Sequence, residues 1–164
     1  MATAYDVEPW TDLFVAGAGA GAALAGLVFV AVSINVERIL AFSGLPERGM
    51  ATVVLLLSVV IVSLVALLPG QSRVALGLEL LALALFFAVF VGYLVRPRPD
   101  EHESRGRVLG REATMLLGTL PFLIGAVSLL LEAGGGLYWV AAGIVTAIAG
   151  GVTNAWVLLV EILR

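Results

Sequence analysis

The sequence predicts an all-α integral membrane bundle of five transmembrane helices that forms a single membrane domain over residues 1–164. The first observation is composition: the 164 residues are 61% hydrophobic and 13% charged, whereas soluble domains have about 45–50% and about 25%. The second is the mean hydropathy of +1.10. The third is that the hydrophobic residues form continuous runs of about 20 residues, which is the length that a helix needs to cross a bilayer.

The apolar residues in these runs follow one another without the alternation that is typical of strands in a membrane barrel. Glu79 is the only charged residue inside them. The short segments 69–73 and 132–136 contain Pro or Gly and predict tight turns that join antiparallel neighbours. Residues 35–40 keep helical spacing and predict an interfacial extension of the first helix. The five predicted spans cover about residues 13–34, 50–68, 74–95, 113–131 and 137–160.

The placement of the nine basic residues, all of them arginine, predicts the orientation. Eight lie in segments on one side of the predicted spans, and only Arg73 lies on the other. Because positive residues collect on the cytoplasmic side, we expect the N-terminus outside and the C-terminus in the cytoplasm. The segment before the first span carries Asp6, Glu8 and Asp12 in place of the basic residues of a signal peptide, so we expect that span to be retained.

Composition also argues against several chemistries. The chain has no cysteine and no lysine, so it offers neither thiolate metal ligands nor a side-chain amine for a Schiff base. The only histidine, His102, falls in a polar loop, which argues against histidine-ligated haem. The net charge of −3 does not suggest a nucleic-acid partner. We therefore expect a protein without catalytic residues, cofactor or metal, whose surroundings are the lipid bilayer.

Small residues recur at four-residue spacing in the first and last spans. Such spacing lets transmembrane helices approach closely. One interpretation is that the two spans pack against each other, and the other is self-association or docking on a partner. The candidate helix-association face comprises Gly17, Gly21, Gly26, Gly143 and Gly151.

Four further residues are candidates for a polar pathway or for polar packing. Glu79 lies roughly 8 Å inside its span, where an ionisable group is costly unless it is paired or hydrated; the Tyr138 hydroxyl is one expected partner. Pro121 interrupts the hydrogen bonding of its span and predicts a kink. Asn154 lies inside the last span, where a buried amide needs hydrogen-bond partners. Asn35 and Asn154 belong to a polar set expected at the inner face, together with Ser33, Glu37, Glu112 and Glu161.

Several segments resemble small multi-span membrane proteins of high-GC bacteria, some of which carry the label "modulator of FtsH protease". The resemblance covers roughly the first half of the chain and rests on residues 14–17, 22–35, 38–40, 45–48 and 68–72. It implies a multi-pass protein of the bacterial cytoplasmic membrane. It implies no catalytic residue, because that group has no established chemistry.

Three functions are compatible with these features. The predicted function is that of a non-enzymatic accessory or assembly component, which forms a homo-oligomer or joins a larger membrane complex. The alternative is a channel or transporter subunit for an ion or small solute, which acts as an oligomer. A membrane enzyme would have to draw on Glu37, Glu112 and Glu161 near His102, and no spacing motif connects them.

Overall fold

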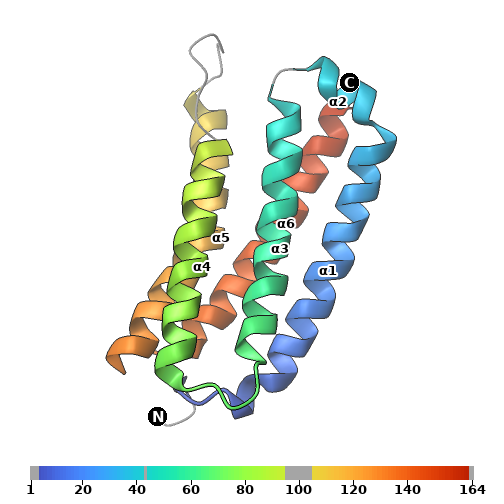
Figure 1. Cartoon of the computed structure of the whole chain (residues 1–164). Helices are drawn as coiled ribbons and strands as arrows, with labels where there is room; N and C mark the ends of the chain where they lie inside the picture. The colour runs from blue at the N-terminus through green and yellow to red at the C-terminus, as the bar shows by residue number, and fades with distance from the viewer. Residues whose placement is uncertain (1–3, 43, 95–104, 163–164) are drawn as a thin grey trace.

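The computed structural model describes residues 4–42, 44–94 and 105–162, and the side chains among them outside 105–117 and 161–162. The described residues form helices and no strands, so the all-α prediction is confirmed (Figure 1). The elements are η2 (Glu8–Trp10), α1 (Thr11–Ile34), α2 (Val36–Ala41), α3 (Leu45–Ala66), α4 (Arg73–Leu94), α5 (Arg105–Leu131) and α6 (Leu137–Ile162).

Four stretches are long and apolar enough to cross a membrane: Glu8–Ile34, Leu45–Ala66, Arg73–Leu94 and Leu137–Val160. The described apolar part of α5, Gly118–Leu131, is shorter. Each of these stretches overlaps a predicted span. The prediction used the rule that, in lipid, a single apolar segment satisfies its own backbone groups only as a helix.

The helices α3, α4, α5 and α6 form a ring in which successive helices are antiparallel, and α1 packs on α3 outside this ring (Figure 1). The central helix is α3, which contacts α1, α4 and α6. Its apolar stretch is 61% buried, against 28% for that of α1 and 33% for that of α4. The outer helices α1 and α4 therefore present most of their surface away from the bundle.

The main core draws large apolar side chains from every long helix. The fully or almost fully buried ones include Phe14, Leu55, Leu76, Leu80, Phe122, Leu129 and Val140. One buried hydroxyl of α3 bonds to backbone: Ser58 Oγ donates to the Leu55 carbonyl oxygen at 2.7 Å. This satisfies a polar group that could not bond to water in the interior.

Three helix boundaries differ clearly from the prediction, and one of them is the start of α5, which begins at Arg105 instead of residue 113. The helical extension after the first span breaks at Asn35, which has φ −107°, and resumes as α2. The only buried residue of α2, Ile39, packs with Leu45 and Leu158. The next helix starts at Leu45 instead of residue 50, because Gly44 adopts φ +84° and Pro46 fits the first turn of a helix.

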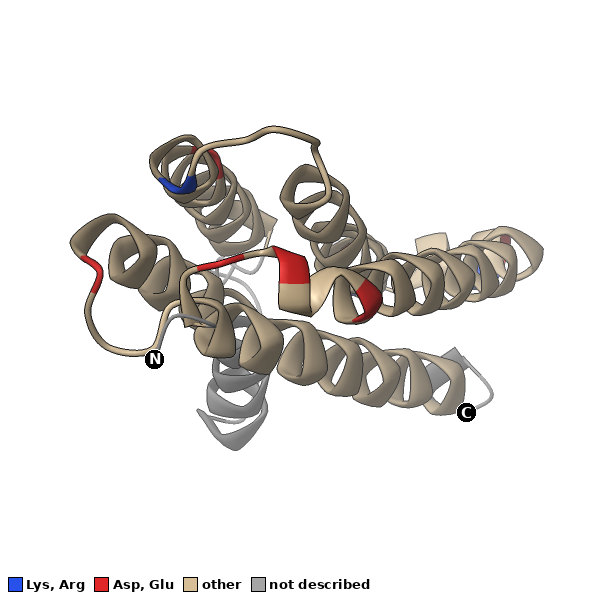
Figure 2. Ribbon diagram, turned by 90° about the horizontal axis from the view of Figure 1, so that it is seen from below, with Lys and Arg blue, Asp and Glu red and all other residues tan. Residues whose placement is uncertain are grey.

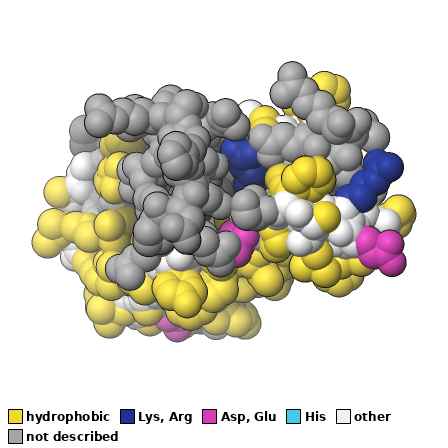
Figure 3. All heavy atoms as spheres, turned by 90° about the horizontal axis from the view of Figure 1, so that it is seen from above, with side chains coloured by type: hydrophobic (Ala, Val, Ile, Leu, Met, Phe, Trp, Pro, Cys, Tyr) yellow, Lys and Arg dark blue, Asp and Glu magenta, His cyan; other side chains and the backbone are white. Residues whose placement is uncertain are grey.

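We call the end of the bundle that holds residues 4–10, 67–72 and 132–136 the hairpin end, and the opposite end the α2 end. Figure 2 shows the acidic positions that gather around the hairpin end near the N-terminal segment. Figure 3 shows basic and acidic side chains near one another at the α2 end, with hydrophobic side chains along the sides.

The turn between α5 and α6 is tied by one serine. The Ser128 hydroxyl donates to the Ala133 carbonyl oxygen and accepts from the Gly136 amide at 2.7 Å. The N-terminal segment lies on this turn, where the Gly135 amide donates to the Tyr5 hydroxyl at 3.3 Å. At the hairpin end, the N-terminal segment is thus bonded to the turn between α5 and α6.

Candidate functional site

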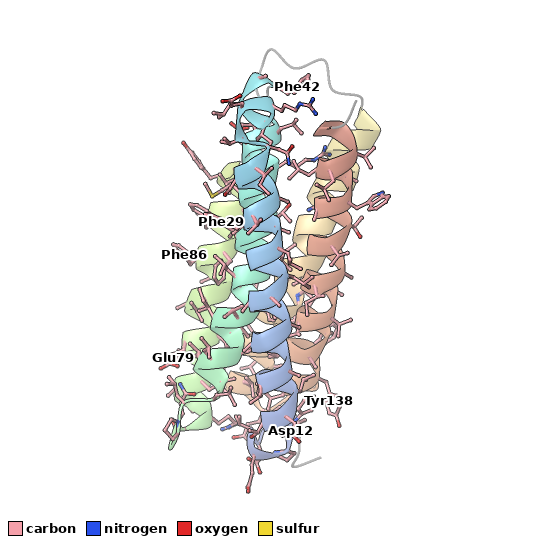
Figure 4. The ribbon with its side chains drawn as sticks, turned by 90° about the vertical axis from the view of Figure 1, so that its right-hand side faces the viewer. Asp12, Phe29, Phe42, Glu79, Phe86 and Tyr138 are labelled. Atoms are coloured by element: carbon pink, nitrogen blue, oxygen red, sulfur yellow. The ribbon has the colours of Figure 1, made fainter. Side chains whose placement is uncertain are left out.

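Glu79 lies on the outward side of α4, between one and two turns beyond the start of the helix at Arg73. The buried side of α4 carries Leu76, Leu80, Ala84, Phe87 and Val91, whereas Glu79 is exposed. Phe86, Phe90 and Tyr93 follow Glu79 by seven, eleven and fourteen residues, which places them on the same side of the helix. We call these four residues the outer stripe of α4. Figure 4 shows Glu79 and Phe86 projecting from the same side of the bundle.

The hydrogen-bond partner of Glu79 comes from the turn before α4. Gln71 Nε2 donates to Glu79 Oε2. Ser72 begins the helix by accepting the Ala75 amide on its hydroxyl at 3.2 Å, as an N-cap does. Gln71, the residue before this cap, extends its side chain along the first turns of α4 and so reaches Glu79.

The expectation that Glu79 reaches Tyr138 is wrong. Tyr138 belongs to α6 and packs edge-to-face on Trp10, with ring centroids 4.7 Å apart. Glu79 and Tyr138 lie on opposite sides of the bundle (Figure 4). The two residues lie at similar levels along the bundle, but only the tertiary arrangement shows that they face away from each other.

Arg73, at the start of α4, joins the α3–α4 hairpin to the α5–α6 hairpin. It forms an ion pair with Glu132 and donates from Nη1 to the Leu129 carbonyl oxygen at 3.2 Å. A cationic side chain near the last carbonyls of α5 interacts favourably with that helix terminus. An open cleft of about 400 Å³ lies next to it, lined by Tyr5, Asp6, Val7, Gln71, Arg73 and Glu132.

Pro121 is buried in the interior of α5, and the helix continues through it from Arg105 to Leu131. Asn35 lies at the other end of the bundle, where its Nδ2 donates to the Ala31 carbonyl oxygen at 2.9 Å. Its neighbour Ser33 likewise donates to the Phe29 carbonyl oxygen at 2.8 Å. Both side chains thus bond to backbone carbonyl oxygens one turn earlier in α1. The side chains of Glu112 and Glu161, and His102, lie outside the described residues.

Asn154 faces α3 from α6 and is only 7% exposed. The residues one turn before and after it, Gly151 and Leu158, lie beside Leu56 and Gly49 of α3. Thr52 lies midway between those two and is fully buried, so Asn154 and Thr52 occupy the same level of the interface. The Asn154 Nδ2 has no hydrogen-bond partner in the described part of the chain.

We predict that Asn154→Leu stabilises the bundle. A buried donor without a partner costs about 1–3 kcal/mol, and the substitution removes it while keeping a branched side chain of similar shape. Thermal unfolding in detergent should show a higher midpoint for the variant. A lower midpoint would mean that the amide has a partner that this structure does not contain.

The glycines of the predicted association face are used differently from one another. A Cβ at Gly17 would lie 3.0 Å from Ser63 Oγ and 3.4 Å from Ile144, and one at Gly21 would lie 3.0 Å from Val60. Both glycines therefore pack within the chain, mainly on α3. The last helix uses Gly143 against Phe122 of α5 and Gly151 against Leu56 of α3.

Gly26 differs, because a Cβ there would meet nothing within 4 Å. It is the member of the predicted face that stays available to another molecule. The close contacts of the first and last spans are thus made chiefly with α3 and α5, and the two spans meet each other only in part, where Gly17 lies beside Ile144 of α6.

The predicted polar residues do not converge on one site. Glu79 is exposed near the hairpin end, Pro121 is inside α5, and Asn35 and Asn154 lie towards the α2 end on different helices. Among the described residues, no three His, Asp or Glu side chains gather as metal ligands would. The sequence-based interpretation missed Gln71 and Ser128, because both act through turn geometry and neither belongs to a periodic pattern.

Scans of the chain against family models, curated proteins and solved structures found no match. The resemblance to small multi-span bacterial membrane proteins stays a prediction. The functional conclusion accordingly rests on the geometry of the described residues.

Proposed function

We propose that this protein is a non-enzymatic integral membrane protein that serves as an accessory or assembly component of a membrane complex. In this proposal all five long helices cross the bacterial cytoplasmic membrane, with the hairpin end outside and the α2 end in the cytoplasm. The four long apolar stretches and the arginine distribution support this arrangement.

The observation that carries the proposal is the exposed carboxylate of Glu79 on a helix that is otherwise apolar along its outward side. In a bilayer, ionisable side chains within spans usually face the bundle interior or a polar cavity, because lipid does not solvate charge. Glu79 faces neither. Its single described hydrogen bond, from Gln71, leaves acceptor capacity on the carboxylate. A partner that covers this surface would supply the missing interactions.

The test is purification from native membranes in a mild detergent, followed by mass spectrometry of the bound proteins. We expect a larger membrane protein in stoichiometric amount. Harsher detergent provides the control, because it should release the partner while the chain stays soluble. Recovery of the chain alone, or only of copies of itself, would contradict an accessory role.

The second candidate, a channel or transporter subunit for an ion or small solute, is favoured by the unpartnered amide of Asn154. In that case purified protein in liposomes should carry a flux that Asn154→Leu reduces. Because Ser58 is also buried at α3 but is satisfied by backbone, Ser58→Ala serves as the matched control. A flux that neither substitution changes would exclude Asn154 from the pathway, and the absence of any flux would exclude the candidate.

A further inference from the structure

We infer that the outer stripe of α4 is the docking surface for a transmembrane helix of a different protein, and that this helix places an arginine or lysine opposite Glu79. The inference rests on the proposed accessory function and deepens it by naming the surface and the chemistry of the partner.

The length of the stripe indicates that the partner is a membrane-spanning helix. Glu79 and Tyr93 are fourteen residues apart, which corresponds to about 21 Å along a helix. This is roughly two thirds of the hydrocarbon thickness of a bilayer. A partner that covers the whole stripe must therefore run beside α4 through most of the membrane.

The shape of the stripe favours side-chain packing. Phe86 and Phe90 stack with centroids 6.0 Å apart and an interplanar angle of 9°. Together with Leu85, Val89 and Tyr93 they line a shallow apolar hollow of about 460 Å³. Phe86 and Tyr93 are 60% and 70% exposed, so their faces are open to a neighbour. Transmembrane helices associate by such close packing and by interhelical polar contacts.

Charge complementarity determines what lies opposite Glu79. A carboxylate that is removed from water is stabilised best by a cationic donor at hydrogen-bond distance. The hollow occupies the other part of the stripe, so the partner needs its cation near the hairpin end and apolar side chains farther along. This pattern describes a helix with a basic residue between one and two turns inside the membrane.

A second copy of this chain does not fit that description. Copies that share one membrane orientation would bring only Arg73 to the depth of Glu79, because the other eight arginines belong to the opposite side of the spans in the sequence. Arg73 is already engaged with Glu132 and with the Leu129 carbonyl oxygen. Self-association through the stripe would break these contacts to satisfy Glu79.

The experiment combines a charge reversal with a photocrosslink. In native cells we would place a photoreactive phenylalanine at Phe86, and at Val145 of α6 as an exposed control position. Separately, Glu79→Lys is compared with Glu8→Lys. This control makes the same charge change at an exposed residue of η2, before the apolar run of α1 begins. Thermal unfolding of each variant checks that the bundle is intact.

We expect the Phe86 position, and not Val145, to crosslink to a different membrane protein. Glu79→Lys should reduce co-purification of that protein at least about tenfold, which corresponds to the loss of about 1.4 kcal/mol, whereas Glu8→Lys leaves it unchanged. Glu79→Gln, which keeps hydrogen bonding without charge, should give an intermediate loss.

The outcomes separate this inference from the proposed function. A partner that co-purifies but ignores Glu79→Lys and does not crosslink from Phe86 would overturn the docking surface and leave the accessory role intact. A crosslink from Phe86 to a second copy would overturn the choice of partner. The absence of any bound protein would overturn both.

Discussion

Gly21→Leu is expected to separate α1 from α3 and to destabilise the bundle by about 3 kcal/mol or more. A Cβ at Gly21 would lie 3.0 Å from Val60 Cγ2 and 3.2 Å from the Leu56 carbonyl oxygen. The valine methyl can move, but the carbonyl belongs to the backbone of the most buried helix. Overpacking typically costs about 1–3 kcal/mol, and more where the backbone has to shift. The measurement is the midpoint of thermal unfolding in detergent.

The matched control is Gly26→Leu on the same helix. Nothing lies within 4 Å of a Cβ at Gly26, so this substitution should change stability by no more than about 0.5 kcal/mol. The two variants, Gly21→Leu and Gly26→Leu, lie in the same helix, exchange the same residue types and add the same hydrophobic side chain. Equal effects at the two positions would contradict the packing of α1 on α3. An unchanged fold with weaker partner recovery for Gly26→Leu would instead identify a second contact surface.

The second large effect is expected from Gly136→Ala in the turn between α5 and α6. Gly136 adopts φ +50°, and a Cβ there would overlap the Ala4 carbonyl oxygen. The left-handed backbone costs a residue with a side chain about 1–2 kcal/mol. The clash adds about 1–3 kcal/mol unless the N-terminal segment is displaced. We expect a lower unfolding midpoint and faster proteolysis within residues 4–10.

Gly70→Ala provides the comparison, because Gly70 also has positive φ, +70°, but a Cβ there would meet nothing within 4 Å. It should show the backbone cost alone, with no change in proteolysis of the N-terminal segment. The difference between the two variants therefore measures how strongly residues 4–10 hold the turn. Equal midpoints and equal proteolysis would contradict the described contact between Gly136 and Ala4.

The helices were predictable because their signal is local. Each apolar run is long enough to indicate a helix without reference to any other part of the chain. The turns at 67–72 and 132–136 were predictable for the same reason, since Pro and Gly mark them directly. The breaks at Asn35 and Gly44 were missed, because they depend on where α2 can pack Ile39 against Leu45 and Leu158.

The site residues were predictable in kind but not in their partners. A lone Glu79 in an apolar run stands out in the sequence, and so do glycines at four-residue spacing. Which molecule or helix each one faces depends on the rotation of the helices about their axes, and the uniform apolarity of the runs leaves that rotation open. Amphipathic helices of soluble proteins carry this information in their polar face, and α1 and α4 do not.

By itself, then, the sequence determined that the protein is a set of apolar helices joined by short turns at one end. It also determined that Glu79 is the charge inside the apolar runs. Only the tertiary structure decided that Gly17 and Gly21 pack on α3, that Gln71 and not Tyr138 bonds to Glu79, and that this carboxylate faces outward. The physical reason is that helix formation depends on neighbouring residues, whereas these contacts depend on close packing between segments far apart in the chain.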